Sequence, residues 1–357
     1  MKKILFATTA LFALGGVTAA VADVTVSGHV RFHYDSWKDD AVDADSTECV
    51  VDSKMGGTKV SPVVKSGNNN NEMSTDPEVW IKGNMVTDNG LTVAPEIRFK
   101  GKGGATSRHY IRLSDDWGTL TLGRQHSPAR LMSLDGEWRG TVSGANAPAN
   151  SATDRGTKLM ANPAVGAYAG PARVIYQTPN ISGFQFGISA GDAGGDSKAN
   201  PTDFALVYSM DAFDGGSVKF GYAASSTAAK DAAAKSTKNT GSQFGIELNA
   251  GSFGGSLVQT TKKAKPNMGE EDKQTGQELE VSFNASDNVK VVLHMFNAKG
   301  DSGTLKGQKY KSTGVGAKYT IAPGLWTSLG YNTFSTTPAT GAKQKGNGLR
   351  IRVHAGI

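Results

Sequence analysis

Hydrophobic and polar residues alternate one by one along the last stretch of the chain, LRIRVHAGI (349–357). Leu349, Ile351 and Val353 occupy one set of positions, and Arg350 and Arg352 occupy the set between them. A helix would scatter the apolar residues around its circumference, whereas a strand places them all on one face. The pattern therefore predicts a β-strand with an apolar surface on one side and a polar surface on the other.

The same alternation recurs along the chain, and each predicted strand approaches the length that crosses a bilayer as a tilted strand, about 9–11 residues. Pro95 falls inside one of them, which predicts a bulge or a local loss of pairing because proline has no N–H to donate. We expect sixteen strands, at 24–37, 78–87, 91–101, 106–114, 117–125, 171–178, 183–190, 203–211, 216–224, 241–250, 253–261, 276–285, 289–297, 311–321, 325–334 and 347–357.

The connections between these strands alternate between short and long. Short, turn-forming joints occur at 88–90, 115–116, 179–182, 286–288 and 322–324, and longer polar joints at 38–77, 126–170, 191–202, 225–240, 262–276, 298–310 and 335–346. Outer-membrane barrels have short periplasmic turns and long external loops, and in lipid the strand edges must close on one another. A secreted β-sandwich or propeller is the alternative, but it requires no such alternation, and we find no internal blade repeat.

These patterns predict an all-β fold, a 16-stranded antiparallel up-and-down transmembrane β-barrel with short periplasmic turns and long external loops. A barrel of this size is too wide for side chains to fill, so we expect a water-filled lumen. The apolar face of each strand would meet lipid or a neighbouring subunit, and the polar face would line water.

The first residues predict export from the cytoplasm. Lys2 and Lys3 precede an apolar run over 4–14, and small residues follow at 20–22, so 1–22 resembles a cleaved Sec signal peptide and 23–357 the mature domain. We find no run of about 18 apolar residues, which argues against a transmembrane helix. The composition, 38% hydrophobic with 45 glycines and a mean hydropathy of −0.34, suits a β protein with one wet face.

Charge and cysteine content exclude several classes of protein. The formal net charge is +6, and the basic residues are spaced along strands, so we expect no nucleic-acid binding. Cys49 is the single cysteine, which excludes an intramolecular disulfide framework. The six histidines show no metal-ligand spacing, and we expect no metal, no cofactor and no enzymatic activity.

Two motifs carry a resemblance to a known family. WGTLTLGRQHSPA (117–129), preceded by YIRLS (110–114), and RVIYQTPNISGF (173–184) are similar to the "GLxGxFGTxxxGR" and "RxxYxSPxFxGF" segments of the general porins of Gram-negative, proteobacterial outer membranes. The resemblance implies passive diffusion of small hydrophilic solutes and ions, usually by a homotrimer whose third loop folds inward to narrow the pore. That loop is 126–170 here. The family's barrel-assembly machinery reads a C-terminal aromatic residue, whereas this chain ends in Ile357.

Strand parity assigns charged residues to the lumen. Basic residues outnumber acidic ones there, which predicts a weak preference for anions. From the wall and the third loop we select Arg31, Lys82, Arg98, Arg108, Arg112, Arg173, Asp135 and Glu137 as candidates for the constriction and lumen. Parity places Arg124 outward, where an ion pair at a subunit interface is expected. We also expect Tyr34, Trp37, Trp117, Trp326 and Tyr331 in the aromatic girdles at the two membrane surfaces.

Other interpretations stay open. GISAG (187–191) matches the nucleophile motif G-x-S-x-G, but Ser189 falls in a predicted strand rather than at a strand–turn–helix junction. Ser127 beside His126 leaves a lipase-type barrel as a remote alternative. The alanine-rich 223–235 segment predicts a loop or a short helix. A substrate-specific channel, or a surface adhesin that uses loop 38–77, would share the barrel with a general diffusion porin.

Overall fold

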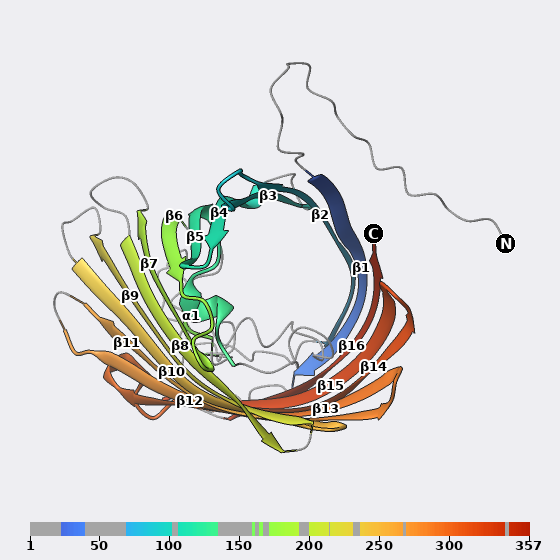
Figure 1. The fold of residues 1–357 in the computed structure, drawn as a ribbon. Helices are drawn as coiled ribbons and strands as arrows, with labels where there is room; N and C mark the ends of the chain where they lie inside the picture. Colours follow the sequence, from blue (N-terminus) through green and yellow to red (C-terminus); the bar gives the residue numbers. More distant parts are fainter. Residues whose placement is uncertain are drawn as a thin grey trace, which may run out of the picture.

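The chain forms a closed barrel of sixteen antiparallel strands, in which each strand pairs with its neighbours in sequence and β1 pairs with β16 (Figure 1). The predicted fold class is therefore confirmed. At the seam, Gly28 and Ile357 exchange two backbone hydrogen bonds of 2.9 Å. The computed structural model describes residues 23–39, 69–101, 106–134, 159–160, 164–166, 171–192, 200–213, 215–230, 236–266, 269–339 and 343–357.

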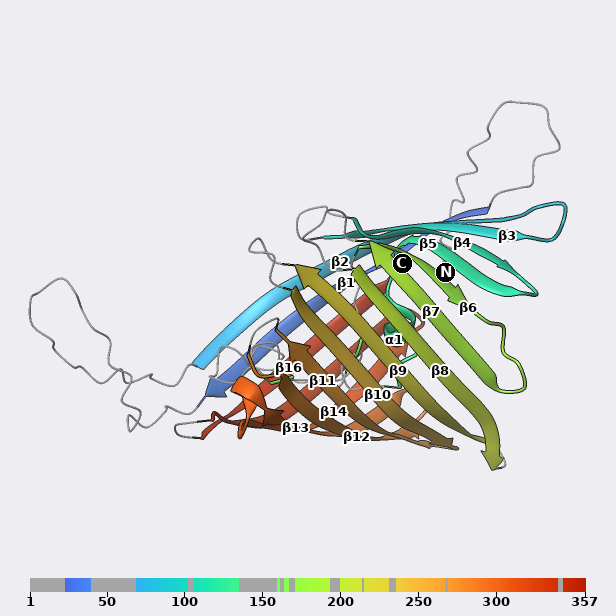
Figure 2. The same ribbon diagram turned by 90° about the vertical axis from the view of Figure 1, so that its left-hand side faces the viewer.

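The strands vary in length around the barrel, and those from β3 to β7 are shorter than those from β8 to β16. They are β1 (Asp23–Asp39), β2 (Asn69–Val86), β3 (Thr92–Lys100), β4 (Thr106–Asp115), β5 (Gly118–Arg124), β6 (Ala172–Gln177), β7 (Phe184–Asp192), β8 (Asn200–Phe213), β9 (Gly216–Lys230), β10 (Ser236–Ala250), β11 (Phe253–Lys265), β12 (Asp272–Ser286), β13 (Val289–Ser302), β14 (Lys309–Ala322), β15 (Leu325–Thr337) and β16 (Gln344–Gly356). Figure 2 shows them running obliquely across the wall, as barrel closure requires.

Two short helical turns accompany the strands among the described residues. Helix α1 (Pro128–Leu131) lies inside the barrel, and the 3-10 turn η3 (Gly303–Leu305) follows β13. Within the described residues, no helix has both the length and the apolar character needed to cross a membrane.

Many strands run further than predicted at their long-loop ends. β2 begins at Asn69 rather than at 78, and β9 continues to Lys230 through part of the alanine-rich stretch, where a loop or short helix was expected. These segments lack regular hydrophobic alternation, but each lies beside a neighbouring strand whose backbone N–H and C=O groups need hydrogen-bond partners. Ladder pairing therefore extends beyond the part of the wall that the hydrophobic pattern marks.

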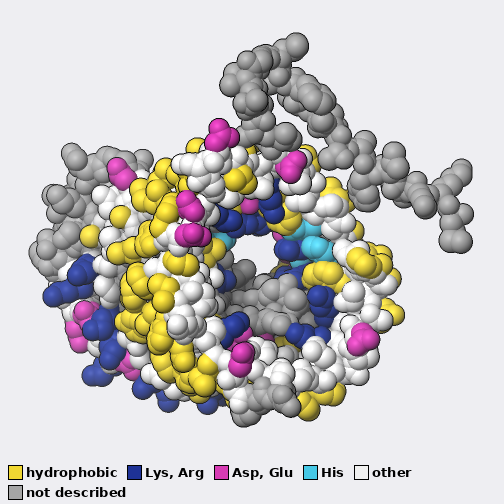
Figure 3. All heavy atoms as spheres, in the orientation of Figure 1, with side chains coloured by type: hydrophobic (Ala, Val, Ile, Leu, Met, Phe, Trp, Pro, Cys, Tyr) yellow, Lys and Arg dark blue, Asp and Glu magenta, His cyan; other side chains and the backbone are white. Residues whose placement is uncertain are grey.

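The outer face of the wall is apolar and the inner face is polar. Large hydrophobic side chains such as Phe32, Leu293 and Ile351 are exposed on the outside, at 39%, 53% and 38%. In Figure 3, hydrophobic side chains cover the outer surface, whereas Lys, Arg and His border the central opening. Exposure of this many apolar side chains in water would be unfavourable, so the outer face fits a hydrocarbon environment.

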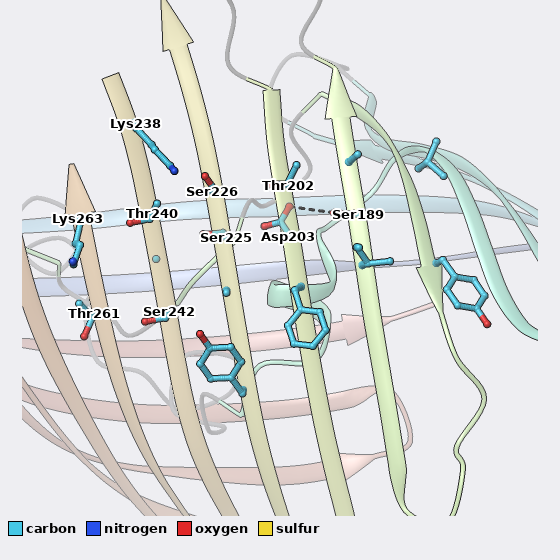
Figure 4. Close-up of a pocket in the computed structure, with 18 residues that line it drawn as sticks. Ser189, Thr202, Asp203, Ser225, Ser226, Lys238, Thr240, Ser242, Thr261 and Lys263 are labelled. Carbon is cyan, nitrogen blue, oxygen red and sulfur yellow. Dashed lines mark hydrogen bonds between the residues drawn. The ribbon is translucent and has the colours of Figure 1, made fainter. Parts of the chain in front are cut away.

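The outer face becomes polar near the long-loop ends of β8–β11. A shallow groove of about 800 Å³ opens there, and Ser226, Lys238, Thr240 and Lys263 project into it beside the more apolar part of the wall (Figure 4). Hydroxyl and ammonium groups facing outward indicate that these strand ends extend past the hydrocarbon into a polar layer.

Pro95 interrupts the pairing of β3 with β2, as its sequence position predicted. The ladder runs through Lys82 opposite Glu96, stops, and resumes at Met85 opposite Val93 without a change of register. A β-carbon on Gly83 would approach Pro95 Cγ to 2.9 Å, so the glycine accommodates the proline ring.

Candidate functional site in the barrel lumen

The inner face of β1–β4 and β16 carries a concentration of basic side chains. Alternation and cross-strand register bring these residues onto one continuous surface facing the opening. Carboxylates are fewer there among the described residues. The basic members are Arg31, Lys82, Arg98, Lys100, Arg108, Arg112, Arg350 and Arg352, and the acidic members are Asp23, Asp35, Glu72, Asp76, Glu78 and Glu96.

Several of these carboxylates are already paired with the basic side chains. Arg350 holds Asp35 through two hydrogen bonds of 2.6 and 2.7 Å, a bidentate geometry. Arg98 bonds Glu78, and Lys100 lies 3.7 Å from the same carboxylate. Pairing neutralises these acids and leaves the basic excess of the wall to face the lumen.

Three of the predicted lumen cations contact uncharged groups instead. Arg108 donates to the Gln125 amide oxygen at 3.3 Å, and Arg112 donates to the Tyr110 hydroxyl at 3.3 Å. Lys82 lies over the Trp80 ring, with its Nζ 5.5 Å from the centroid. Among the described residues none of the three forms a salt bridge, although the Glu96 carboxylate acts on Arg108 and bonds the Tyr110 hydroxyl.

Arg31 also lies on this inner surface, with Nη1 3.9 Å from Asp76, and its Nε donates to His354 Nδ1 at 3.2 Å. His29, Asp76 and Glu78 bring potential metal-ligand atoms within 4.8 Å of one another. Arg98 and Lys100 contact the same carboxylates, so the protein's own cations already supply the positive charge that a metal would bring there.

Arg173 occupies the inner face of β6, as parity predicted, but it does not line the water-filled lumen. Its side chain is 0% exposed and pairs with the equally buried Asp203 at 3.0 Å. Ser189 donates to the same carboxylate at 3.2 Å, as Figure 4 shows. Arg173 is therefore better described as part of a buried cluster than as a pore-lining residue.

This cluster also accounts for the G-x-S-x-G match. Ser189 lies within strand β7, is 3% exposed and bonds Asp203, so it has neither the turn nor the accessibility of a nucleophile elbow. Ser127, the other serine considered, is fully buried.

The described start of the third loop folds against the inner wall of β7–β10. A β-carbon on Gly187 would come within 2.9 Å of Pro128, and one on Gly221 within 2.8 Å of Leu134. Val165, from the far end of the loop, packs beside Gly241 in the same way. The wall has glycine at these three positions and alanine at 205 and 223 beside them, which allows a close approach of the loop to the wall.

A second part of the loop contacts another region of the wall. Leu159 and Met160 pack with Phe296, Tyr310 and Phe334 of β13–β15, and the Met160 N–H donates to Gln274 Oε1 at 2.6 Å. Asp135 and Glu137, the predicted acidic side of the constriction, lie outside the described residues.

His126 lies just beyond β5, at the start of the loop. Burial lowers the pKa of its imidazole to about 4, and the positive charges of Arg108 and Arg130 add to the effect. The imidazole is therefore neutral at pH 7 and gains a proton only in acid.

A row of four aromatic rings crosses the inner wall near the short turns, and the sequence reasoning missed it. Trp326 stacks on His354 at 4.7 Å, His354 lies 4.9 Å from His29, and His29 meets the Trp80 edge at 5.3 Å. Trp326 was expected in an outer girdle, which is wrong: it pairs in register with the inward His354. Strand parity, which the sequence analysis used for charged residues, would also have placed Trp80 and Trp326 inward.

Arg124 lies on the outer face of β5, opposite His109 of β4. Gly118, at the short-turn end of β5, is six residues away, which places Arg124 about 14 Å above that end for a strand tilted by about 45°. The apolar band of such barrels is about 25 Å tall, so these two polar residues lie near its middle.

Comparison with known proteins agrees with this geometry. A model of the Gram-negative porin family matches residues 7–348. The chain belongs to that family. No curated protein matches the chain. As a Gram-negative porin, it forms an outer-membrane diffusion channel, and the predicted family, location and channel function are confirmed.

Solved structures share the porin's barrel. An anion-selective porin from Comamonas acidovorans is 17% identical, covering 93% of this chain and 99% of that one, with a TM-score of 0.64. A loop-deletion mutant of OmpT, an outer membrane protein of Vibrio cholerae, is 11% identical over 94% and 99%, with a TM-score of 0.66. The outer membrane channel DcaP of Acinetobacter baumannii is 11% identical over 96% and 100%, with a TM-score of 0.63. At these identities the likeness shows the fold.

Proposed function

We propose that the porin conducts small hydrophilic solutes with a weak preference for anions. The observation that carries this is the basic inner face of β1–β4 and β16, where Lys82, Arg108 and Arg112 contact uncharged groups while several carboxylates are paired. A low-dielectric wall with an excess of positive charge concentrates anions in the adjacent water, so anions would be enriched in the lumen. An anion-selective porin among the structural neighbours is consistent with this proposal.

The reversal potential of the porin in a planar bilayer under a KCl gradient tests the preference. We expect a sign that reports chloride as the more permeant ion, and the Arg108→Gln/Arg112→Gln double variant should move the potential toward zero. A cation-selective wild-type channel would contradict the proposal. Lys238→Gln, on the outer face of β10, is the control and should leave the potential unchanged.

We infer that 126–170 forms the narrowest part of the channel, with Asp135 and Glu137 opposing the basic wall. The contacts of Leu134, Met160 and Val165 with the inner wall support an inward course for both ends of this loop. Catalysis is not part of the proposal, because Ser189 is buried within a strand and bonded to Asp203.

We propose a homotrimer in which Arg124 and His109 meet a neighbouring subunit. A basic side chain that faces lipid near the middle of the bilayer costs about 2–4 kcal/mol, so covering the outer face around Arg124 and His109 with a neighbouring subunit would be favourable. Native mass spectrometry of the detergent-extracted porin should give three copies. Arg124→Ala should shift the population toward monomers, whereas Lys238→Ala should not. A monomeric wild-type porin would rule out this assembly.

The remaining proposals concern biogenesis. Removal of 1–22, export and assembly by the barrel-assembly machinery follow from the sequence and the family. The mass of the mature protein should correspond to a chain beginning at Asp23.

A further inference from the structure

The four inward rings near the short turns form a continuous surface, which we call the mouth band: Trp80, His29, His354 and Trp326. They come from four adjacent strands, in the order β2, β1, β16 and β15, and neighbouring ring centroids are 4.7–5.3 Å apart. Each ring lies closer to the short turns than to the long loops along its strand. The band therefore lines one side of the lumen at its periplasmic mouth.

Aromatic rings on this face are an exception to the polar inner wall. His29 is 2% exposed and lies beneath its neighbours, whereas Trp80, His354 and Trp326 are partly exposed. The inner face of a water-filled barrel is ordinarily polar, because an indole in contact with water leaves apolar surface uncovered. Trp326 lies face to face with His354, and His29 meets the edge of Trp80, so a solute ring in the lumen can contact the exposed parts of this row edge to face.

Basic groups flank both ends of the mouth band. Lys82 and Arg98 lie over Trp80 at 5.5 and 5.4 Å, and Lys318 lies over Trp326 at 5.0 Å. A solute ring on the band would thus have an ammonium or guanidinium group within reach at either side. Arg98 is bonded to Glu78, and Arg352, which lies 5.9 Å over Trp326, is only 5% exposed, so Lys82 and Lys318 are the accessible cations at the two ends.

We propose that the mouth band is a weak binding site for planar aromatic carboxylates, which makes them preferred solutes of this porin. The proposal rests on the anion preference proposed above and names the class of anion. The ring of the solute contacts the exposed parts of the two indoles and of His354, while its carboxylate pairs with Lys82 or Lys318. A solute must also leave, and one aromatic contact plus one solvated ion pair gives the weak, reversible binding that conduction requires.

Single-channel recording with benzoate and cyclohexanecarboxylate tests the site, because the two anions have the same charge and similar size but only benzoate has an aromatic ring. We expect benzoate to interrupt the chloride current about fivefold more effectively, the ratio that one aromatic contact supplies. Trp326→Leu should bring the ratio close to one. Trp117→Leu, which alters an outward tryptophan that is 44% exposed, is the matched control and should leave the ratio unchanged.

Two further variants keep the test informative if Trp326→Leu assembles poorly. Trp326→Phe retains a ring and should preserve most of the preference for benzoate. Lys318→Gln should weaken both anions while the ratio between them persists. Equal effects of the two anions on the wild-type channel, or a ratio that survives Trp326→Leu, would overturn the proposal.

The reversal potential in KCl, measured on the same channels, separates this inference from the proposed function. If chloride remains preferred while benzoate and cyclohexanecarboxylate act alike, the mouth band fails and the anion preference stands. If the channel prefers potassium, the anion preference itself fails.

Discussion

The buried pair of Arg173 and Asp203 leads to a quantitative prediction about barrel stability. Both side chains are 0% exposed and their charged atoms are 3.0 Å apart. At an effective dielectric constant of about 20 this separation corresponds to an attraction of about 5 kcal/mol, and removing one member of a buried pair costs about 3–5 kcal/mol. Asp203→Asn preserves the shape but leaves the guanidinium without a counter-charge, so we expect it to lower the free energy of unfolding by about 3 kcal/mol or more.

The assay is urea unfolding of the barrel folded into phospholipid vesicles, followed by tryptophan fluorescence. The matched control is Glu247→Gln, which removes an ion pair with Lys219 of comparable length, 2.8 Å, whose side chains are 39% and 27% exposed. Pairs this exposed contribute about 1 kcal/mol at most. The contrast isolates the effect of burial.

A double replacement decides whether charge is the cause. Arg173→Met with Asp203→Leu removes both buried charges, and such exchanges are often neutral or stabilising. We expect the double variant to be more stable than Asp203→Asn alone. A loss below about 1 kcal/mol for Asp203→Asn, equal to that of Glu247→Gln, would show that water reaches the pair and would refute the reasoning.

Three other predictions follow from the wall and the loop. Gly187→Val would drive a side chain into Pro128 and Met132 of the third loop. Single-channel conductance should rise as the loop is displaced, and the free energy of unfolding should fall by about 1–3 kcal/mol. Unchanged conductance would count against this packing. The free energy of unfolding should fall as the pH drops from 6.5 toward 4, because unfolded His126 takes up a proton before the folded form does. His126→Gln should remove up to about 3 kcal/mol of this fall in urea unfolding, and an equal pH dependence in both proteins would refute it. Ile351→Arg places a charge on the lipid face and should cost about 2–4 kcal/mol, whereas Lys82→Ile on the inner face should cost little in the same assay.

Much of the barrel could be predicted because strand periodicity is a local property. Alternation in 349–357 placed Ile351 outward and Arg350 inward without any knowledge of the neighbouring strands. The number of strands followed from the alternation of short and long joints, and the family from two motifs in 117–129 and 173–184. The polar extensions of β2 and β9 were missed because hydrogen-bond pairing with a neighbour, rather than side-chain pattern, decides them.

The sequence by itself determined which face of the wall each strand residue occupies, because that depends only on position along a strand. Tertiary structure alone decided what each inward residue meets. It buried Arg173 against Asp203 beneath the loop, left Lys82 on an indole, and joined rings from positions 29, 80, 326 and 354 into one surface. Register across strands that are hundreds of residues apart sets these contacts, and barrel closure, which brings β1 beside β16, has no signature in any single segment.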